Sequence, residues 1–275
     1  MKKWLSCILL IVMLMSSAVL PAYTEEEGDG TGEWIMELPE YEEGTIPDEW
    51  EDVAPVVPEG LEKTIFGADD RVTVSNTSQY PYSAICYIVA HFECGCDSTG
   101  SGFLVGQSTV FTAAHCVVCH KHGKWAENLT FYFGYKNDRN YLYKYNGRWH
   151  AYAGNTFSNG YSNSYDYAVV KLDKDISQTT GSFGVRWNLS DAALSNSYAY
   201  AAGYRHGVLR YDQGYVEPYG AEFYKFWMDW QPGNSGGPLF TSDHYAIGIN
   251  IAYSDEYNKG YRITSDVLYA YDYVK

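Results

Sequence analysis

The sequence predicts an all-β protein, on the strength of its composition and of the length of its apolar stretches. From Thr64 to the end there are 212 residues rich in Tyr, Val, Phe and Gly, enough for one large β unit or two small barrels. Their apolar stretches are short and are broken by Gly, Asn, Asp and Ser, as in strands joined by turns. We expect strands over residues 84–92, 102–105, 128–135, 167–172, 198–204, 222–227 and 245–251. One helix is expected, over Val267–Val274, with Ser265 or Asp266 as its cap.

The start of the chain predicts secretion. Lys2 and Lys3 precede an unbroken apolar run from Cys7 to Met15, followed by small residues up to Ala22. This pattern is typical of a signal peptide, here over residues 1–22, with an uncleaved anchor as the alternative. The run is shorter than the roughly 20 apolar residues that span a bilayer. We therefore expect an extracellular protein without stable membrane association.

Residues 23–63 form an acidic segment of different character. They hold 15 acidic residues, four prolines and one basic residue, Lys63, which argues against a core of their own. The net charge of −15 is made up of +2 from residues 1–22, −14 from this segment and only −3 from residues 64–275. The folded part has no basic patch, so we expect no nucleic-acid partner.

Three short segments carry the chemistry of the folded part. They are residues 111–116 (FTAAHC), 166–172 (DYAVVKL) and 233–239 (GNSGGPL), which supply His115, Asp166 and Ser235. Their order along the chain is that of chymotrypsin-like hydrolases and differs from that of subtilisins and α/β-hydrolases. The three residues are therefore predicted to form a catalytic triad.

The predicted roles follow from acid–base chemistry. A serine hydroxyl is a weak nucleophile near neutral pH, so Ser235 needs a base such as His115 within hydrogen-bond reach. Asp166 would fix the ring tautomer and stabilise the imidazolium. The glycines around Ser235 let the backbone N–H groups of Gly233 and Ser235 face one point and form an oxyanion hole.

The chain resembles the bacterial glutamyl endopeptidases, secreted members of the chymotrypsin-like clan. The resemblance starts at residues 65–71 (IFGADDR) and 80–84 (YPYSA), continues through the three triad segments, and ends near residues 261–265 (YRITS). It implies two six-stranded antiparallel barrels, over about 64–180 and 181–275, with a short C-terminal helix. His115 and Asp166 would come from the first barrel and Ser235 from the second.

The same resemblance implies a zymogen that is cut after Lys63, so that residues 23–63 act as a propeptide. In that family the freed amino terminus helps to form the specificity pocket. The residue before Ser235 is Asn234, whereas animal trypsins need an Asp there to bind their new amino terminus. That ion pair is therefore not available to this chain.

The pocket departs from the family pattern. Where glutamyl endopeptidases typically have a His that binds the substrate carboxylate, this chain has Asn250, and Trp230 stands where they tend to have a Thr. Tyr253 falls at the expected pocket mouth. Asp229 lies six residues before Ser235, the spacing at which trypsins place the Asp that binds Lys or Arg. Cleavage after Glu and cleavage after Lys or Arg both stay open.

Five cysteines remain once Cys7 leaves with the signal peptide, and outside the cell they are expected to pair. The resemblance favours a Cys96–Cys116 disulfide bond with Cys94–Cys119 beside it and Cys86 left over, a connectivity that the sequence does not settle.

Two other interpretations of the cysteines are kept open. Residues 116–120 (CVVCH) match a c-type haem attachment motif, which leaves Asp166 and Ser235 unexplained. A zinc ion could also be held by cysteines 94, 96, 116 and 119, with His120 or His122. Our prediction remains a monomeric enzyme without cofactor or metal, acting on protein or peptide substrates. A catalytically inactive, protease-like binding module is the alternative function.

Overall fold

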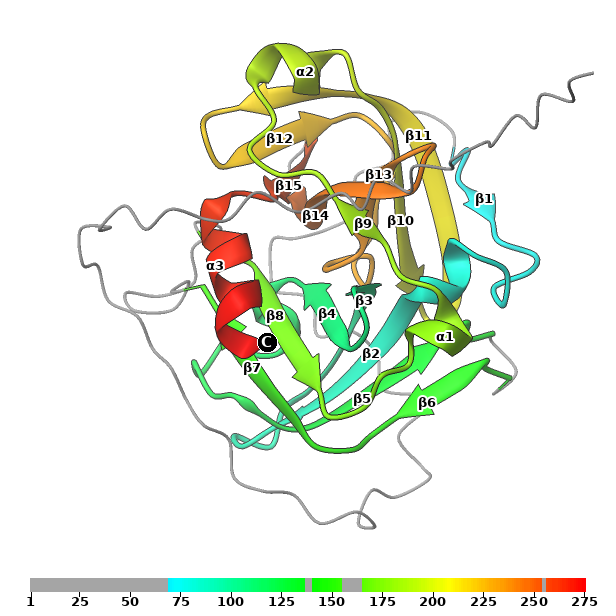
Figure 1. Ribbon diagram of the computed structural model, residues 1–275, viewed down its shortest axis with the longest axis vertical. Helices are drawn as coiled ribbons and strands as arrows, with labels where there is room; N and C mark the ends of the chain where they lie inside the picture. Colours follow the sequence, from blue (N-terminus) through cyan, green and yellow to red (C-terminus); the bar gives the residue numbers. More distant parts are fainter. Residues whose placement is uncertain (1–68, 137–139, 155–164, 254–255) are drawn as a thin grey trace, which may run out of the picture. The chain divides into compact units, whose positions relative to one another are not determined.

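Two mainly antiparallel β-sheets build the structure, a computed structural model that describes residues 69–136, 140–154, 165–253 and 256–275 (Figure 1). The predicted signal peptide and acidic segment lie outside the described residues. All described residues belong to one compact unit.

The first sheet is open and has seven strands in the order β6-β5-β2-β3-β4-β8-β7. Their bounds are β2 (Ile85–Phe92), β3 (Asp97–Val105), β4 (Thr109–Thr112), β5 (Ala126–Phe133), β6 (Tyr143–Tyr145), β7 (Trp149–Ala153) and β8 (Ala168–Leu172). Strand β4 pairs with both β3 and β8, so the ends of these strands lie next to each other.

The second sheet closes into a six-stranded barrel in the order β11-β10-β13-β14-β15-β12, because β12 also pairs with β11. The barrel strands are β10 (Tyr198–Arg205), β11 (Val208–Tyr219), β12 (Phe223–Phe226), β13 (Pro238–Thr241), β14 (Tyr245–Tyr253) and β15 (Asn258–Arg262). The short strands β1 (Val72–Thr73) and β9 (Gly184–Val185) add to it by pairing with β11 and β14.

The all-β prediction is confirmed, and each of the seven expected ranges overlaps a strand. One detail differs from the expected architecture, because the first sheet is curled and open rather than a closed six-stranded barrel. The sequence did not indicate β11, although it is the longest strand. Most of its residues are half-buried or exposed, and they include Asp, Gln, Gly and Pro, which weaken the sequence signal of a strand.

Helices are few and short. They are α1 (Ser177–Thr180), α2 (Asp191–Ser195), α3 (Ser265–Val274) and the 3₁₀ turns η2 (Tyr82–Ala84) and η3 (Ala114–Cys116). The expected terminal helix is confirmed as α3, but its N-cap is Thr264 rather than Ser265 or Asp266. No helix in the described part of the chain has the length and apolarity needed to cross a membrane.

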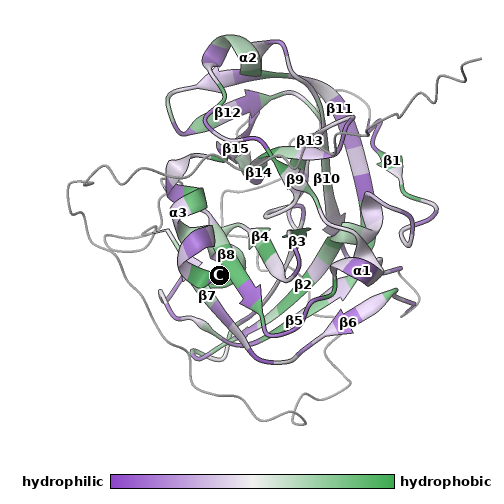
Figure 2. Cartoon of the chain, viewed as in Figure 1, coloured by the Kyte–Doolittle hydropathy of each residue, from purple (hydrophilic) through white to green (hydrophobic). Residues whose placement is uncertain are grey.

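The buried hydrophobic residues of the described chain form three clusters, one in each sheet and one between the two sheets. One cluster lies within the first sheet, around Ile88 and Phe131, and another lies inside the barrel, around Tyr224 and Leu239. The largest cluster joins the two sheets and includes Phe111 together with residues of the barrel and of α3. Figure 2 shows hydrophobic residues along β2 and β8 and mostly hydrophilic ones along β11. This shared core fixes the loops that meet between the sheets.

Candidate active site

His115 and Asp166 are joined at the ends of two paired strands. Thr112 of β4 lies opposite Ala168 of β8. The turn η3, which follows β4, therefore lies close to Asp166, which precedes β8. His115 Nδ1 lies 2.8 Å from Asp166 Oδ2, and the His115 backbone N–H donates to Asp166 Oδ1 at 3.1 Å. Asp166 is fully buried. Because a carboxylate only accepts hydrogen bonds, this contact places the proton on Nδ1 and leaves Nε2 as the basic nitrogen.

The surroundings of His115 favour its protonated form. Burial by itself lowers the pKa of the imidazole, but the charge and hydrogen bond of Asp166, with a smaller contribution from Cys116, outweigh it. The pKa of His115 is therefore raised well above its ordinary value. A His with a raised pKa is a stronger base than a free imidazole.

The segment around Ser235 is a tight turn that Asn234 braces. The Gln231 backbone N–H donates to Asn234 Oδ1 at 3.0 Å, and the Asn234 backbone N–H donates to the Gln231 carbonyl at 3.0 Å. The Gly237 N–H then donates to the Asn234 carbonyl at 3.0 Å. The side chain of Asn234 is thus engaged inside the turn.

The N–H groups of Gly233 and Ser235 donate to no protein acceptor in the part of the chain that the structure describes. Their neighbours in the turn, Asn234 and Gly236, both donate to carbonyl groups. The sequence predicts an oxyanion hole formed by Gly233 and Ser235. Two backbone N–H groups without a protein acceptor are what the binding of an oxyanion requires.

Ser101, which sequence reasoning missed, ties the Ser235 turn to the first sheet. Its backbone N–H donates to the Ser235 carbonyl at 2.7 Å, and its hydroxyl donates to the Gly233 carbonyl at 2.8 Å. The same hydroxyl accepts from the Tyr204 backbone N–H at 2.7 Å. No sequence signal indicated Ser101, because its partner Gly233 lies 132 residues away.

Gly236 permits the close approach of the two sheets. A Cβ at this position would lie 2.1 Å from the Ser101 carbonyl oxygen and 2.2 Å from Thr112 Oγ1, and its φ is +84°. Both the contact distances and the left-handed backbone therefore require glycine. The Ser235 turn consequently rests directly on the end of β4, just before His115.

The structure brings Ser235 next to the segment that carries His115, where the Cys116 thiol donates a hydrogen bond to the Ser235 backbone. The Sγ atom of Cys116 lies 3.5 Å from the Ser235 carbonyl oxygen. Among the described residues, Ser235 Oγ has no hydrogen-bond partner. Hydrogen bonds between a nucleophile and its base are often longer in a free enzyme than in its substrate complex.

The candidate pocket residues lie mostly in the interior. Asp229 is buried, and its Oδ2 accepts a hydrogen bond from the Asp70 backbone N–H at 3.3 Å. The Asp229 backbone N–H donates to Asp212 Oδ2 at 2.6 Å. Burial raises the pKa of Asp212, with smaller contributions from the charges of Asp70 and Asp229. Trp230 is buried in the core of the barrel.

Asn250 is fully buried and faces Tyr224. Its Nδ2 donates to the Pro238 carbonyl at 3.1 Å, and its Oδ1 accepts from the Tyr224 hydroxyl at 3.0 Å. Tyr253 ends β14, where its backbone pairs with Asn258. The predicted roles of Asp229, Trp230, Asn250 and Tyr253 in substrate binding stay predictions.

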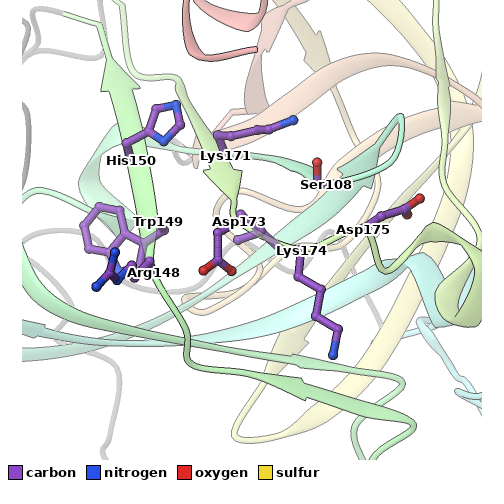
Figure 3. A pocket seen from close by; sticks show the side chains of 9 residues that line it. Ser108, Arg148, Trp149, His150, Lys171, Asp173, Lys174 and Asp175 are labelled. Atoms are coloured by element: carbon purple, nitrogen blue, oxygen red, sulfur yellow. The ribbon is translucent and has the colours of Figure 1, made fainter. Parts of the chain in front are cut away.

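A hollow of about 410 Å³ lies away from these residues, at the β7–β8 edge of the first sheet (Figure 3). Both acidic and basic side chains line it, as Figure 3 shows, and none of the candidate site residues is among them. The lining residues are Ser108, Arg148, Trp149, His150, Lys171, Leu172, Asp173, Lys174 and Asp175.

The five described cysteines are free thiols, so the structure contains none of the expected disulfide bonds. The Cys116 thiol lies beside the Ser235 carbonyl, whereas Cys96 lies beside His122. The expected Cys96–Cys116 pair is therefore separated, because the turn η3 directs Cys116 toward the barrel.

Comparisons with known proteins show which family the sequence is similar to. A model of the trypsin-like peptidase domain matches residues 100–249. A glutamyl endopeptidase of Bacillus licheniformis is 31% identical over 225 residues, covering 75% of this chain and 67% of that protein. A protein of Bacillus subtilis named extracellular metalloprotease is 31% identical over 216 residues, covering 74% and 67%.

The fold is also similar to a solved structure. The structure of a Glu endopeptidase in complex with MPD superposes with a TM-score of 0.67 at 23% identity. The match covers 76% of this chain and 98% of that one, and it extends the likeness beyond the segment that the family model matches.

Proposed function

The chain belongs to the trypsin-like peptidase family and is a serine endopeptidase of chymotrypsin-like fold, and from this we propose that His115, Asp166 and Ser235 are its catalytic triad. The observation that carries the proposal is the 2.8 Å contact between His115 Nδ1 and the fully buried Asp166. It fixes the tautomer in which Nε2 can accept the proton of a serine hydroxyl.

In the proposed reaction, Ser235 Oγ attacks the carbonyl carbon of the substrate peptide bond while His115 Nε2 takes the hydroxyl proton. The carbonyl π electrons move to oxygen, and the resulting oxyanion accepts hydrogen bonds from the N–H groups of Gly233 and Ser235. Loss of one such donor typically lowers kcat by about 10²–10³. Asp166 stabilises the imidazolium through its charge.

Collapse of the tetrahedral intermediate expels the amine, which takes the proton from His115, and leaves an acyl group on Ser235 Oγ. Water then attacks the acyl carbon with His115 again as base, and a second tetrahedral intermediate releases the carboxylic acid and restores the hydroxyl. His115 thus acts as base and then acid in each half of the cycle.

We further propose that the segment after Lys63 shapes the specificity site. The Arg71 guanidinium donates to Gln231 Oε1 at 2.6 Å, next to the contact between the Asp70 N–H and Asp229. These contacts support a structural role for Asp229, and so favour the Glu-directed alternative over cleavage after Lys or Arg. Cleavage after Glu would then depend on the new amino terminus rather than on a charged pocket residue.

We propose that the enzyme is secreted by its signal peptide (1–22) and activated by removal of the acidic propeptide (23–63). The Bacillus subtilis relative is named an extracellular protein, which supports secretion. Protein or peptide substrates are those of the family, and the active form is proposed to be a monomer.

A fluorophosphonate probe tests the triad. It should label the mature protein at Ser235, and labelling should fall by more than about 10³ in Ser235→Ala and in His115→Ala. Ser195→Ala, at an exposed serine of α2, is the matched control and should label like the wild type. Absence of labelling in folded wild-type protein would favour the alternative, an inactive protease-like binding module.

A further inference from the structure

The geometry points to a structural zinc site built from Cys94, Cys96, Cys119 and His122. One ligand atom from each of these residues, three thiols and one imidazole nitrogen, lies within 4.8 Å of all the others. Three thiolates and one His form one of the usual ligand sets of structural zinc. We propose that this cluster binds one Zn²⁺ with four protein ligands.

The distances match the edges of a zinc tetrahedron. Zinc bonds of about 2.3 Å to sulfur and 2.0–2.1 Å to nitrogen, at the tetrahedral angle, place S and N about 3.6 Å apart. His122 Nδ1 lies 3.5 Å from Cys96 Sγ and 3.5 Å from Cys119 Sγ. Two edges of the tetrahedron thus already have the length that zinc requires, and the other ligand atoms lie within 4.8 Å of one another.

The first pair of ligands comes from the turn between β2 and β3. Phe92 N–H donates to the Cys96 carbonyl at 2.9 Å, and Gly95 N–H donates to the Phe92 carbonyl at 2.8 Å. Gly95 has a φ of +77°, which closes the turn and allows the flanking Cys94 and Cys96 to point the same way.

The second pair comes from the turn that follows η3. Cys119 N–H donates to the Lys124 carbonyl, and Gly123 N–H donates to the Cys119 carbonyl, each at 2.7 Å. The two turns are also joined directly, because Glu93 N–H donates to the Trp125 carbonyl at 3.2 Å. The backbone therefore holds both pairs of ligands in place, as a preformed metal site requires.

A disulfide bond accounts for the cluster less well than a metal does. A bond between two of the three sulfurs would leave the third thiol and the His122 nitrogen converging on the same point without a role. Zinc uses all four groups: the three thiols each lose a proton, and the neutral imidazole supplies a lone pair. The complex then carries one net negative charge, and Lys121 and Lys124 lie in the same turn as Cys119.

The site would be structural rather than catalytic. Four protein ligands complete the tetrahedron, so no position is left for a reacting water. Cys119 lies four residues after His115, and Cys116 lies outside the cluster. The metal would therefore fix the segment that carries His115 onto the β2–β3 turn without touching the reacting groups.

The metal content of the full chain tests the proposal. The protein is secreted with Ser235→Ala, which prevents self-digestion, and purified without chelator. Elemental analysis should find about one zinc per chain. In denaturant, an alkylating agent should label cysteines 94, 96 and 119 with no reductant present. Absence of zinc together with a disulfide bond among these three cysteines would overturn the proposal, as would another metal in stoichiometric amount.

Single substitutions locate the site. Cys94→Ser, Cys119→Ser and His122→Ala should each weaken zinc binding by at least about 100-fold, whereas the neighbouring His120→Ala should keep stoichiometric zinc. Cys86→Ala, at a buried cysteine outside the cluster, is the matched thiol control. If a ligand variant does not fold, Co²⁺ binding by the parent chain decides, because tetrahedral thiolate ligation gives intense cobalt bands. Octahedral bands, or unchanged zinc in folded ligand variants, would contradict the assignment.

Discussion

Replacing Ser101 by Ala should damage both stability and turnover. The Ser101 hydroxyl is fully buried and bridges the Tyr204 N–H and the Gly233 carbonyl, at 2.7 and 2.8 Å. The variant leaves these two buried backbone groups without that partner. Each unpaired group costs about 1–3 kcal/mol, so the free energy of unfolding should fall by about 2–6 kcal/mol. Domains typically have about 5–15 kcal/mol, so the variant should still fold unless both the loss is at the top of its range and the parent stability is at the bottom of its own.

The kinetic effect follows from the same contact. The hydroxyl holds the Gly233 peptide plane and thereby the direction of its neighbouring N–H groups. Misdirection of one oxyanion donor should lower kcat by about 10². The KM should change much less, because the oxyanion exists only after the attack of Ser235 on the substrate.

The assay uses two backgrounds and one control. Urea unfolding is measured on chains that also carry Ser235→Ala, and kinetics are measured on active chains with one peptide substrate. Ser98→Ala removes a half-buried hydroxyl from the same strand β3 and should change the free energy of unfolding by less than about 0.5 kcal/mol. If Ser101→Ala behaves like Ser98→Ala in both measurements, the bridge has no functional role and the reasoning fails.

Three further predictions concern the triad, the pocket and maturation. Because the pKa of His115 is raised and the base must be neutral, kcat/KM should rise with pH and reach half its maximum above pH of about 6.5. Asp166→Asn should move that midpoint to lower pH and lower kcat by about 10⁴, and an unmoved midpoint would contradict this origin of the shift. Because the pKa of His115 is higher in the folded than in the unfolded chain, the His115–Asp166 pair stabilises the fold fully below pH of about 6.5. This contribution is lost as pH rises through the raised pKa. Asp229→Asn should change the ratio of cleavage after Lys or Arg to cleavage after Glu by less than about twofold, whereas a fall of about 100-fold or more would reveal a basic-specific pocket. Amino-terminal sequencing of the active protein should begin at or within about two residues of Thr64, and active enzyme that retains Glu25 would rule out an inhibitory leader.

The sequence determined what is local in this protein. Short apolar stretches between turn residues predict strands because burial and turn formation depend on neighbours a few residues apart. The segments that supply the proposed triad of His115, Asp166 and Ser235 could be recognised for the same reason, since each is a short run of adjacent residues. The terminal helix was predicted within one turn, and only its cap differed.

The tertiary structure alone decided which distant groups meet. Ser101 reaches Gly233 across 132 residues, and no spacing rule connects them. The contact between Asp229 Oδ2 and the Asp70 backbone N–H joins residues 159 positions apart. The sequence left several groupings of its cysteines open. In the fold, two turns bring Cys119 and His122 together with Cys94 and Cys96, and Cys116 lies outside this group. Such contacts depend on how two sheets close on each other, which one-dimensional patterns do not record.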